Sequence, residues 1–169
     1  MFSFLSSYPK KVLNTILALC FLAVVLVSCD SSIADDDSVS GGGSVPAQLR
    51  GDWTSTGGDG YIIDGDTLAY VSLWDGVNYG FVGNIRSVSN FNSSSGVIII
   101  EYSSGAFYEE AYPFTATYYR NLNGNTVQLS NAYDPTNVRT DTAALYEAKE
   151  KFTQHSIGNY AAMWGTYTK

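Results

Sequence analysis

The feature that most constrains this chain is a series of short runs rich in Tyr, Val, Ile and Thr, which begins at Leu49 and continues to the C-terminus. Turn-forming residues separate these runs at intervals of roughly 8–12 residues, the spacing of antiparallel meanders and barrels. With 45% hydrophobic and 15% charged residues, the chain is too apolar for disorder and too weakly charged for a coiled coil. The sequence therefore predicts an all-β fold, a small up-and-down antiparallel β-barrel of about eight strands with one α-helix near the C-terminus.

Pairs of turn residues mark tight hairpins within the predicted barrel. A glycine in such a pair supplies the positive φ that a two-residue hairpin turn requires. Gly83 lies inside the long strand predicted over residues 78–91, where a glycine is typical of a bulge or bend. The hairpin pairs are Asp64-Gly65, Asp75-Gly76 and Asn123-Gly124.

One strand of the predicted sheet must be buried on both of its faces. The run over residues 97–100 is apolar on both faces of its strand, so another element must pack on its outer side. The amphipathic helix predicted over residues 141–153 supplies this cover, because Leu145, Ala148 and Phe152 fall on one stripe.

Local patterns predict how this helix and the sheet end. We expect Thr140 or Asp141 to cap the helix N-terminus, and Glu147 and Lys151 to form an i,i+4 pair on the solvent side. The last strand, predicted over residues 160–167, pairs with the first and removes both sheet edges.

An eight-stranded barrel has an interior just wide enough to be filled by side chains or to hold one small ligand. Large residues are expected to face inward from the first, sixth and seventh strands, so we predict a filled barrel. These residues are Leu49, Trp53, Phe114, Tyr118, Val127 and Leu129.

The N-terminal segment is predicted to be an export signal. Two lysines precede an apolar stretch over residues 16–27 that is too short to span a bilayer as a folded helix. The stretch ends in Leu26-Val27-Ser28-Cys29, which resembles the bacterial lipobox. That resemblance implies that Cys29 is lipidated and becomes the mature N-terminus, and two or three acyl chains would make its membrane attachment permanent. The alternative is a plain secretory peptide that leaves Cys29 free.

These features divide the chain into a lipoprotein signal peptide over residues 1–28, a flexible acidic Ser/Gly tether over residues 29–46 and a β-barrel domain over residues 47–169. We expect a lipid-anchored protein of the cell envelope, at the outer membrane or cell surface rather than the inner membrane. Asp30 resembles the inner-membrane retention signal of enteric bacteria. That signal does not apply in all bacterial phyla, so the sequence does not determine which membrane leaflet finally holds the lipid anchor.

Gly51-Asp52-Trp53, at the entry of the first strand, resembles the G-x-W signature of the calycins, the superfamily of lipocalins and related barrels. The resemblance implies that Trp53 plugs one barrel end and that a basic residue from a late strand packs across it, with Arg120 as the candidate. The mature chain is also similar to small uncharacterised lipoproteins of spirochaetes, a family with no activity to carry over.

Charge and cysteine content exclude several classes of partner. Nine basic and sixteen acidic residues give a net charge of −7, and loss of the export signal leaves seven basic against sixteen acidic residues, or −9. Because no basic stripe could displace counterions from a phosphate backbone, no nucleic-acid partner is expected. Cys29 is the single cysteine after residue 28, so we expect no disulfide, no metal site and no cofactor.

Candidate catalytic residues all have simpler explanations. His155 follows the predicted helix, where the helix dipole favours a cation, so we assign it a capping or surface role. Glu109 and Glu110 are adjacent and would point to opposite faces of a strand. Three nearby aspartates are interpreted as hairpin-turn residues rather than calcium ligands, because no bidentate Glu follows them: Asp59, Asp64 and Asp66. We therefore expect no catalytic residues and no enzyme activity.

The aromatic residues carry most of the functional content. The domain holds more rings than an eight-stranded interior accommodates, so some must be exposed. Trp74 is expected at a hairpin tip, and Tyr108 and Tyr112 flank the two glutamates. Exposed Tyr and Trp favour contact with a protein or glycan, although rings can also simply cover strand faces. The leading hypothesis is a non-catalytic interaction module on a lipid anchor, and the alternative is a calycin-like carrier of a small apolar ligand.

Overall fold

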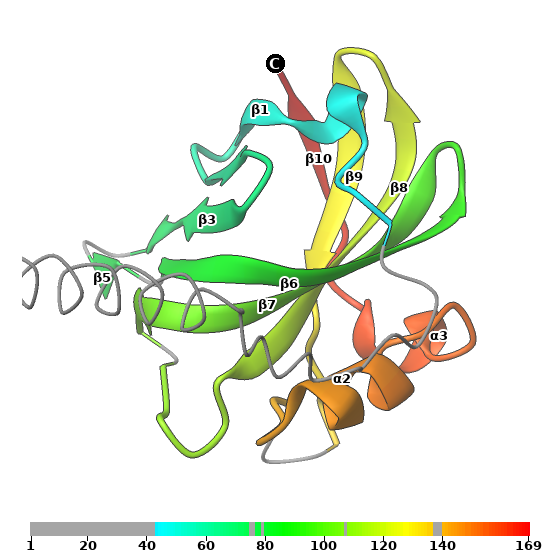
Figure 1. Ribbon diagram of the computed structural model, residues 1–169. Helices are drawn as coiled ribbons and strands as arrows, with labels where there is room; N and C mark the ends of the chain where they lie inside the picture. The colour runs from blue at the N-terminus through cyan, green and yellow to red at the C-terminus, as the bar shows by residue number, and fades with distance from the viewer. Residues whose placement is uncertain (1–42, 75–76, 79, 107, 137–139) are drawn as a thin grey trace, which may run out of the picture. The chain divides into compact units, whose positions relative to one another are not determined.

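The computed structural model describes residues 43–74, 77–78, 80–106, 108–136 and 140–169. Eight of its strands form a closed antiparallel barrel in which strands that follow one another along the chain are paired, and the last pairs with the first (Figure 1). The predicted up-and-down barrel with a helix near the C-terminus is thereby confirmed. The barrel strands are β1 (Gly51–Ser55), β2 (Gly60–Ile63), β3 (Thr67–Val71), β6 (Phe81–Asn92), β7 (Ser95–Gly105), β8 (Phe114–Asn123), β9 (Thr126–Asn131) and β10 (Gly165–Thr168).

A short hairpin interrupts the meander between β3 and β6. β4 (Leu73–Trp74) and β5 (Val77–Asn78) pair with each other in a separate two-stranded sheet. The strand predicted over residues 78–91 is therefore divided, because β6 begins only at Phe81. The predicted turn pair Asp75-Gly76 lies outside the described residues.

The barrel is closed by β10. Thr168 lies opposite Thr54 of β1, and Tyr167 lies opposite Ser55, while the other edge of β10 pairs with β9. The predicted pairing of the last strand with the first is confirmed. The strand is shorter than predicted, since Tyr160 belongs to α3 (Ile157–Tyr160) and β10 starts at Gly165.

Two predicted hairpin turns differ in their chemistry. Gly124 has a φ of 52°, the positive value predicted for it. Gly65 is not among the described residues with positive φ, so that prediction is wrong. Instead, the Asp64 carboxylate accepts hydrogen bonds from the backbone N–H groups of Asp66 and Thr67, at 2.8 and 2.7 Å. An aspartate side chain, not a left-handed glycine, stabilises this turn.

Gly83 marks the irregularity predicted for the long strand. The pairing of β6 with β7 shifts register between Val82 and Gly83. A Cβ atom at Gly83 would lie 2.8 Å from the carbonyl oxygen of Glu101, closer than such atoms approach. Only glycine therefore lets the two backbones come together at this bend.

The buried apolar residues form two layers, one inside the barrel and one outside it. Along β7, Ile98 and Ile100 belong to the interior cluster, whereas Val97 and Ile99 belong to the outer one. The outer cluster packs under α2 (Leu145–Lys151) and α3, through Ala148 among other residues (Figure 1). The predicted helical cover over residues 97–100 is confirmed, with α2 shorter than the predicted helix.

The predicted orientation of β8 is wrong. Phe114 and Tyr118 were expected to face inward, but both belong to the outer layer under the helices. Tyr119 is the interior residue, and Thr117 lies opposite the interior Ile98. Because β8 is covered on both faces, it carries apolar residues on both, and alternation alone does not indicate which set faces the interior.

The beginning of α2 also differs from the prediction. Its N-cap is Ala144 rather than Thr140 or Asp141. The Glu147 carboxylate accepts hydrogen bonds from the backbone N–H groups of Ala143 and Ala144, at 3.2 and 3.3 Å. The Lys151 ammonium donates to the carbonyl oxygen of Thr140. Both side chains thus bind backbone groups before the helix, and the predicted Glu147–Lys151 pair is not formed.

The described residues begin inside the segment predicted as tether. The backbone N–H of Gly43 donates to the carbonyl oxygen of Val88 at 2.8 Å, and Val45 is only 2% exposed. A 3₁₀ turn, η1 (Ala47–Leu49), then leads into β1, so Leu49 precedes the first strand. None of the helices in the described residues has the length and apolarity needed to cross a membrane.

Candidate functional site

The two ends of the barrel are built differently, and the first is packed shut. Trp53 and Leu49 are fully buried there, and the indole N–H of Trp53 donates to the carbonyl oxygen of Leu49 at 2.7 Å. The implication that Trp53 plugs a barrel end is consistent with this geometry. η1 places Leu49 across the end of the interior, so side chains fill this half of the barrel.

The cation above Trp53 is not the expected one. The Lys169 ammonium lies 4.5 Å from the Trp53 ring centroid and donates to the carbonyl oxygens of Gln48 and Arg50, at 2.8 and 2.6 Å. The Arg120 guanidinium instead stacks over Trp164, 4.0 Å from its centroid. The assignment of Arg120 to Trp53 is wrong because antiparallel pairing of β10 with β1 brings the last residue of the chain to Gly51.

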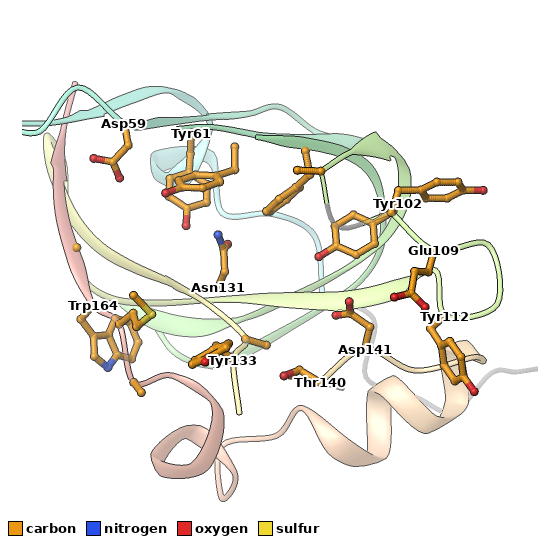
Figure 2. A pocket seen from close by; sticks show the side chains of 18 of the residues that line it. Asp59, Tyr61, Tyr102, Glu109, Tyr112, Asn131, Tyr133, Thr140, Asp141 and Trp164 are labelled. Carbon is orange, nitrogen blue, oxygen red and sulfur yellow. The ribbon is translucent and has the colours of Figure 1, made fainter. Parts of the chain in front are cut away.

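The opposite end of the barrel is hollow. A cavity of about 910 Å³ opens there, between the strand ends and the connections that follow them (Figure 2). The predicted filling of the barrel is therefore right for one end and wrong for the other. Among the described residues, nine aromatic ones line the cavity: Tyr61, Tyr70, Phe81, Tyr102, Tyr108, Tyr112, Tyr133, Trp164 and Tyr167.

Five of these rings form a continuous row, four of them on the adjacent strands β2, β3, β6 and β7 and the fifth on β10, which β1 separates from β2. Tyr61 of β2 lies 4.7 Å from Tyr70 of β3, centroid to centroid, and meets Tyr167 of β10 edge-on at 5.0 Å. Tyr70 lies 5.6 Å from Phe81 of β6, which meets Tyr102 of β7 edge-on at 5.3 Å. Cross-strand aromatic pairs of this kind stabilise a sheet, and here they also make one wall of the cavity.

Asp59 stands at the end of this row. Its carboxylate accepts hydrogen bonds from the hydroxyl of Tyr167, at 2.7 Å, and from the hydroxyl of Ser55. Partial burial tends to raise the pKa of Asp59, but the hydrogen bonds from Ser55, Tyr167 and Tyr70 outweigh it, and the pKa lies below its ordinary value. The carboxylate is thus ionised at neutral pH and held in one orientation.

The tyrosines of the wall are neutral at physiological pH. Burial raises the pKa of Tyr61 well above its ordinary value, and burial together with the hydrogen bond to Asp59 raises that of Tyr167. Burial and the nearby charge of Asp141 raise the pKa of Tyr102. These phenols can donate hydrogen bonds and offer ring faces, but they do not supply an anionic base or nucleophile near pH 7.

The remaining walls are more polar. Figure 2 shows Asn131 of β9 pointing across the cavity toward Tyr61, with Glu109 and Asp141 on the side where Tyr102 lies. The amide oxygen of Asn131 accepts a hydrogen bond from the buried Thr117 hydroxyl at 2.9 Å, which fixes its orientation. A bound molecule would therefore meet aromatic faces on one side and amide and carboxylate groups on the others.

Several residues noted in the sequence meet in this cavity. Tyr108, Glu109 and Tyr112 line it from the connection between β7 and β8, so the two glutamates do not lie on a strand as predicted. Tyr108 is 44% exposed at the mouth, as predicted for some of the rings at loop ends. The side chain of Trp74 lies outside the described part of the structure.

Other candidates lie elsewhere. His155 is exposed in the turn between α2 and α3 and does not line the cavity. Asp64 and Asp66 belong to the β2–β3 turn and Asp59 to the β1–β2 turn, as predicted, and Asp59 also lines the cavity. Within the described residues no group of three or more His, Cys, Asp or Glu side chains could hold a metal ion. The predicted lipidation site, Cys29, lies outside those residues.

Sequence patterns did not identify the wall itself. Tyr61, Tyr70, Tyr102 and Tyr167 sit on four strands, and each looks like an ordinary half-buried strand residue by itself. The sequence indicated only that the domain has more aromatic residues than a barrel interior holds, so some tyrosines must lie outside a filled core. Comparisons with protein-family models, curated proteins and solved structures gave no match.

Proposed function

We propose that this protein binds a small molecule in the cavity at the open end of its barrel. The observation that carries the proposal is the cavity of about 910 Å³ in a barrel whose other end is packed shut. Ligand pockets in proteins span roughly 300–1,000 Å³ and combine aromatic walls with a few placed polar groups. This cavity has both properties, so the carrier hypothesis becomes the preferred one.

The residues that line the cavity argue against the small apolar ligand expected from the sequence. A purely apolar ligand would shield the carboxylates of Asp59, Glu109 and Asp141 from water and offer them no polar group in return, at a cost in free energy. A fatty acid would in addition bring a like charge to them. An amphipathic molecule, with an apolar face for the rings and a polar group for the other walls, fits this arrangement better than either.

Contact with a protein or glycan is the second candidate function. It is favoured by the exposure of rings at the cavity mouth, where Tyr108 is 44% and Tyr133 51% exposed. A glycan end could enter the cavity while the rest of the chain stays on these rings. Loss of glycan or protein capture in Tyr133→Ser, with small-molecule binding retained, would favour this alternative.

We also propose that the barrel is held at the cell envelope by lipid on Cys29, at the outer membrane or cell surface. The support is the sequence Leu26-Val27-Ser28-Cys29 after an apolar stretch. Metabolic labelling with a fatty acid should mark the natural chain and not Cys29→Ala, which should leave the membrane fraction. Persistent label on Cys29→Ala would contradict the lipid anchor and leave the cavity proposal untouched.

The binding proposal is tested with the neutral fluorescent probe N-phenyl-1-naphthylamine. We expect saturable binding with one site per chain, and energy transfer from tryptophan, since Trp164 lines the cavity. Ala162→Trp adds an indole at the cavity wall and should weaken binding by about tenfold or more, which corresponds to roughly 1.4 kcal/mol. Thr54→Trp, on the outer face of β1, is the matched control and should bind as the natural protein does. Absence of saturable binding, or equal binding by both variants, would contradict the proposal.

A further inference from the structure

We infer that the ligand of this cavity is an organic cation, bound by the carboxylate of Asp59 and the aromatic rings beside it. The inference rests on the proposed binding function and names the chemical class of ligand. Three features carry it: the sign of the charges that line the cavity, the position of Asp59, and the arrangement of Tyr61, Tyr70 and Phe81.

The charged groups of the cavity have one sign. Asp59, Glu109 and Asp141 are acidic, and none of the described lining residues is Lys, Arg or His. The whole chain carries a net charge of −7, which adds to the same potential. A concave site with charges of one sign and low-dielectric walls concentrates ions of the opposite sign, so this cavity attracts cations and repels anions.

Asp59 is built to act as the counter-charge. Its two oxygens accept hydrogen bonds from different sides, Oδ2 from Tyr167 and Oδ1 from Ser55, so the carboxylate plane does not rotate freely. An ionised carboxylate has about four acceptor sites, and hydrogen bonds from hydroxyl groups leave its negative charge in place. A ligand ammonium that enters the cavity thus meets an oriented charge without having to order it.

The neighbouring rings supply a second attraction for a cation. Tyr61 and Tyr70 are inclined by 40° with centroids 4.7 Å apart, and Tyr70 and Phe81 are again inclined by 40°. Successive ring planes are therefore tilted against one another, and all three rings line the cavity. A cation within about 6 Å of a ring centroid is attracted by the ring quadrupole, and the attraction grows as the cation loses its water.

Neutral and anionic ligands make different use of these groups. A sugar could stack on the rings and hydrogen-bond to Asp59, but it would gain little from the negative charge itself. An anion would lose affinity at the same position. The affinities of a cation, a neutral molecule and an anion of similar size and shape therefore show which class of ligand the cavity prefers.

The test compares choline with its neutral isostere 3,3-dimethylbutan-1-ol and the anion 3,3-dimethylbutanoate, each titrated calorimetrically into the protein. We expect choline to bind about tenfold more tightly than the alcohol, and the anion most weakly, since a tenfold ratio corresponds to one moderate charge contact. Rising salt concentration should weaken choline binding and leave the alcohol unchanged.

Substitutions locate the effect. Asp59→Asn keeps the shape, replaces one acceptor oxygen by an amide donor and removes the charge, and should lower choline affinity about fivefold, whereas Asp52→Asn on the outer face of β1 should not. Tyr70→Leu should lower choline affinity more than Tyr70→Phe does, because only the phenylalanine keeps the ring. The neutral N-phenyl-1-naphthylamine should bind the Asp52→Asn control as it binds the natural protein.

The outcomes separate this inference from the function on which it rests. Equal affinity for choline and the alcohol, or no change in Asp59→Asn, overturns the cation assignment while naphthylamine binding still supports a ligand cavity. Preference for the anion overturns it as well. Failure of the natural protein to bind naphthylamine overturns the binding function itself.

Discussion

The packed end and the open end of the barrel use the same eight strands but connect them differently. At the packed end β2–β3, β6–β7 and β8–β9 are joined by turns of two or three residues, and Trp53 and Leu49 fill the space between them. At the open end the β1–β2 connection is also short, but long connections separate β7 from β8 and β9 from β10 (Figure 1), and described residues of both line the cavity. Short turns let side chains meet across the axis, whereas long connections keep the strand ends apart and line a cavity.

The two ends also differ in the kind of aromatic residue they place inside. Trp53 is surrounded by apolar side chains and its one polar group donates to a backbone carbonyl. The open end uses tyrosines, and the hydroxyl of one of them, Tyr167, donates to Asp59. An apolar core gains from complete burial, while a binding wall gains from rings that keep a polar group at the edge.

The strongest test removes the strand that belongs to both ends. Truncation after Trp164 deletes β10, which leaves β1 and β9 without their partner and removes Tyr167 and Lys169. We expect loss of cooperative thermal unfolding, measured by circular dichroism, because two sheet edges and the interior become exposed. A truncated protein that still melts cooperatively would mean that the closed barrel is not needed for folding.

Replacing one aromatic side chain at each barrel end by alanine should show whether that ring stabilises a packed core or only lines the cavity. Trp53→Ala should lower the free energy of unfolding by about 3–5 kcal/mol, as removal of a buried aromatic side chain does. Tyr70→Ala, at a half-buried wall position, should cost about 1–2 kcal/mol, since the cavity already exposes part of the ring. Urea unfolding measures both values. Equal losses would indicate that the open end is packed as tightly as the other.

A smaller effect on stability is expected when the cation over the Trp53 ring is removed. Lys169→Gln removes the cation above the Trp53 ring and weakens two hydrogen bonds to backbone carbonyls, so it should destabilise the protein by about 1 kcal/mol. Arg120→Gln should affect the Trp53 environment little, because Arg120 lies over Trp164. Near-ultraviolet circular dichroism and tryptophan fluorescence should show which indole each change perturbs. A Trp53 signal that follows Arg120 would restore the calycin-like assignment.

The smallest expected effect is the response of Asp59 to acid. Because its folded-state pKa lies below the ordinary value of 3.8, the carboxylate stabilises the fold above that value and loses this contribution as the pH falls through the folded-state pKa. Asp59→Asn should therefore flatten the loss of stability below about pH 4. Asp52→Asn serves as the control, and an identical acid profile for both variants would contradict the role of the Tyr167 and Ser55 hydrogen bonds.

The fold was predictable where local chemistry and burial pattern agree. The strand runs, the turn at Gly124, the bulge at Gly83 and the helix over Val97 and Ile99 were all expected from periodicity and residue type. The predictions failed where two alternatives share the same local pattern. β8 carries apolar residues on both faces, and Gly65 follows an aspartate whose side chain stabilises the turn by itself.

The cavity could be predicted only in part. An excess of rings implied that the interior could not hold them all, and Tyr108 is one of the exposed rings. The pairing of Asp59 with Tyr167, residues 108 positions apart, has no local signature. Strand pairing around the closed barrel places them in contact.

By itself, the sequence determined a β-barrel with a covering helix, because side-chain alternation and turn chemistry act over a few residues. The tertiary structure decided which end is filled and which is hollow. That outcome depends on barrel closure, which brings Lys169 over Trp53 and sets Tyr167 beside Tyr61. Contacts between residues so distant in the chain arise only when every strand has its register, so no single segment encodes the cavity.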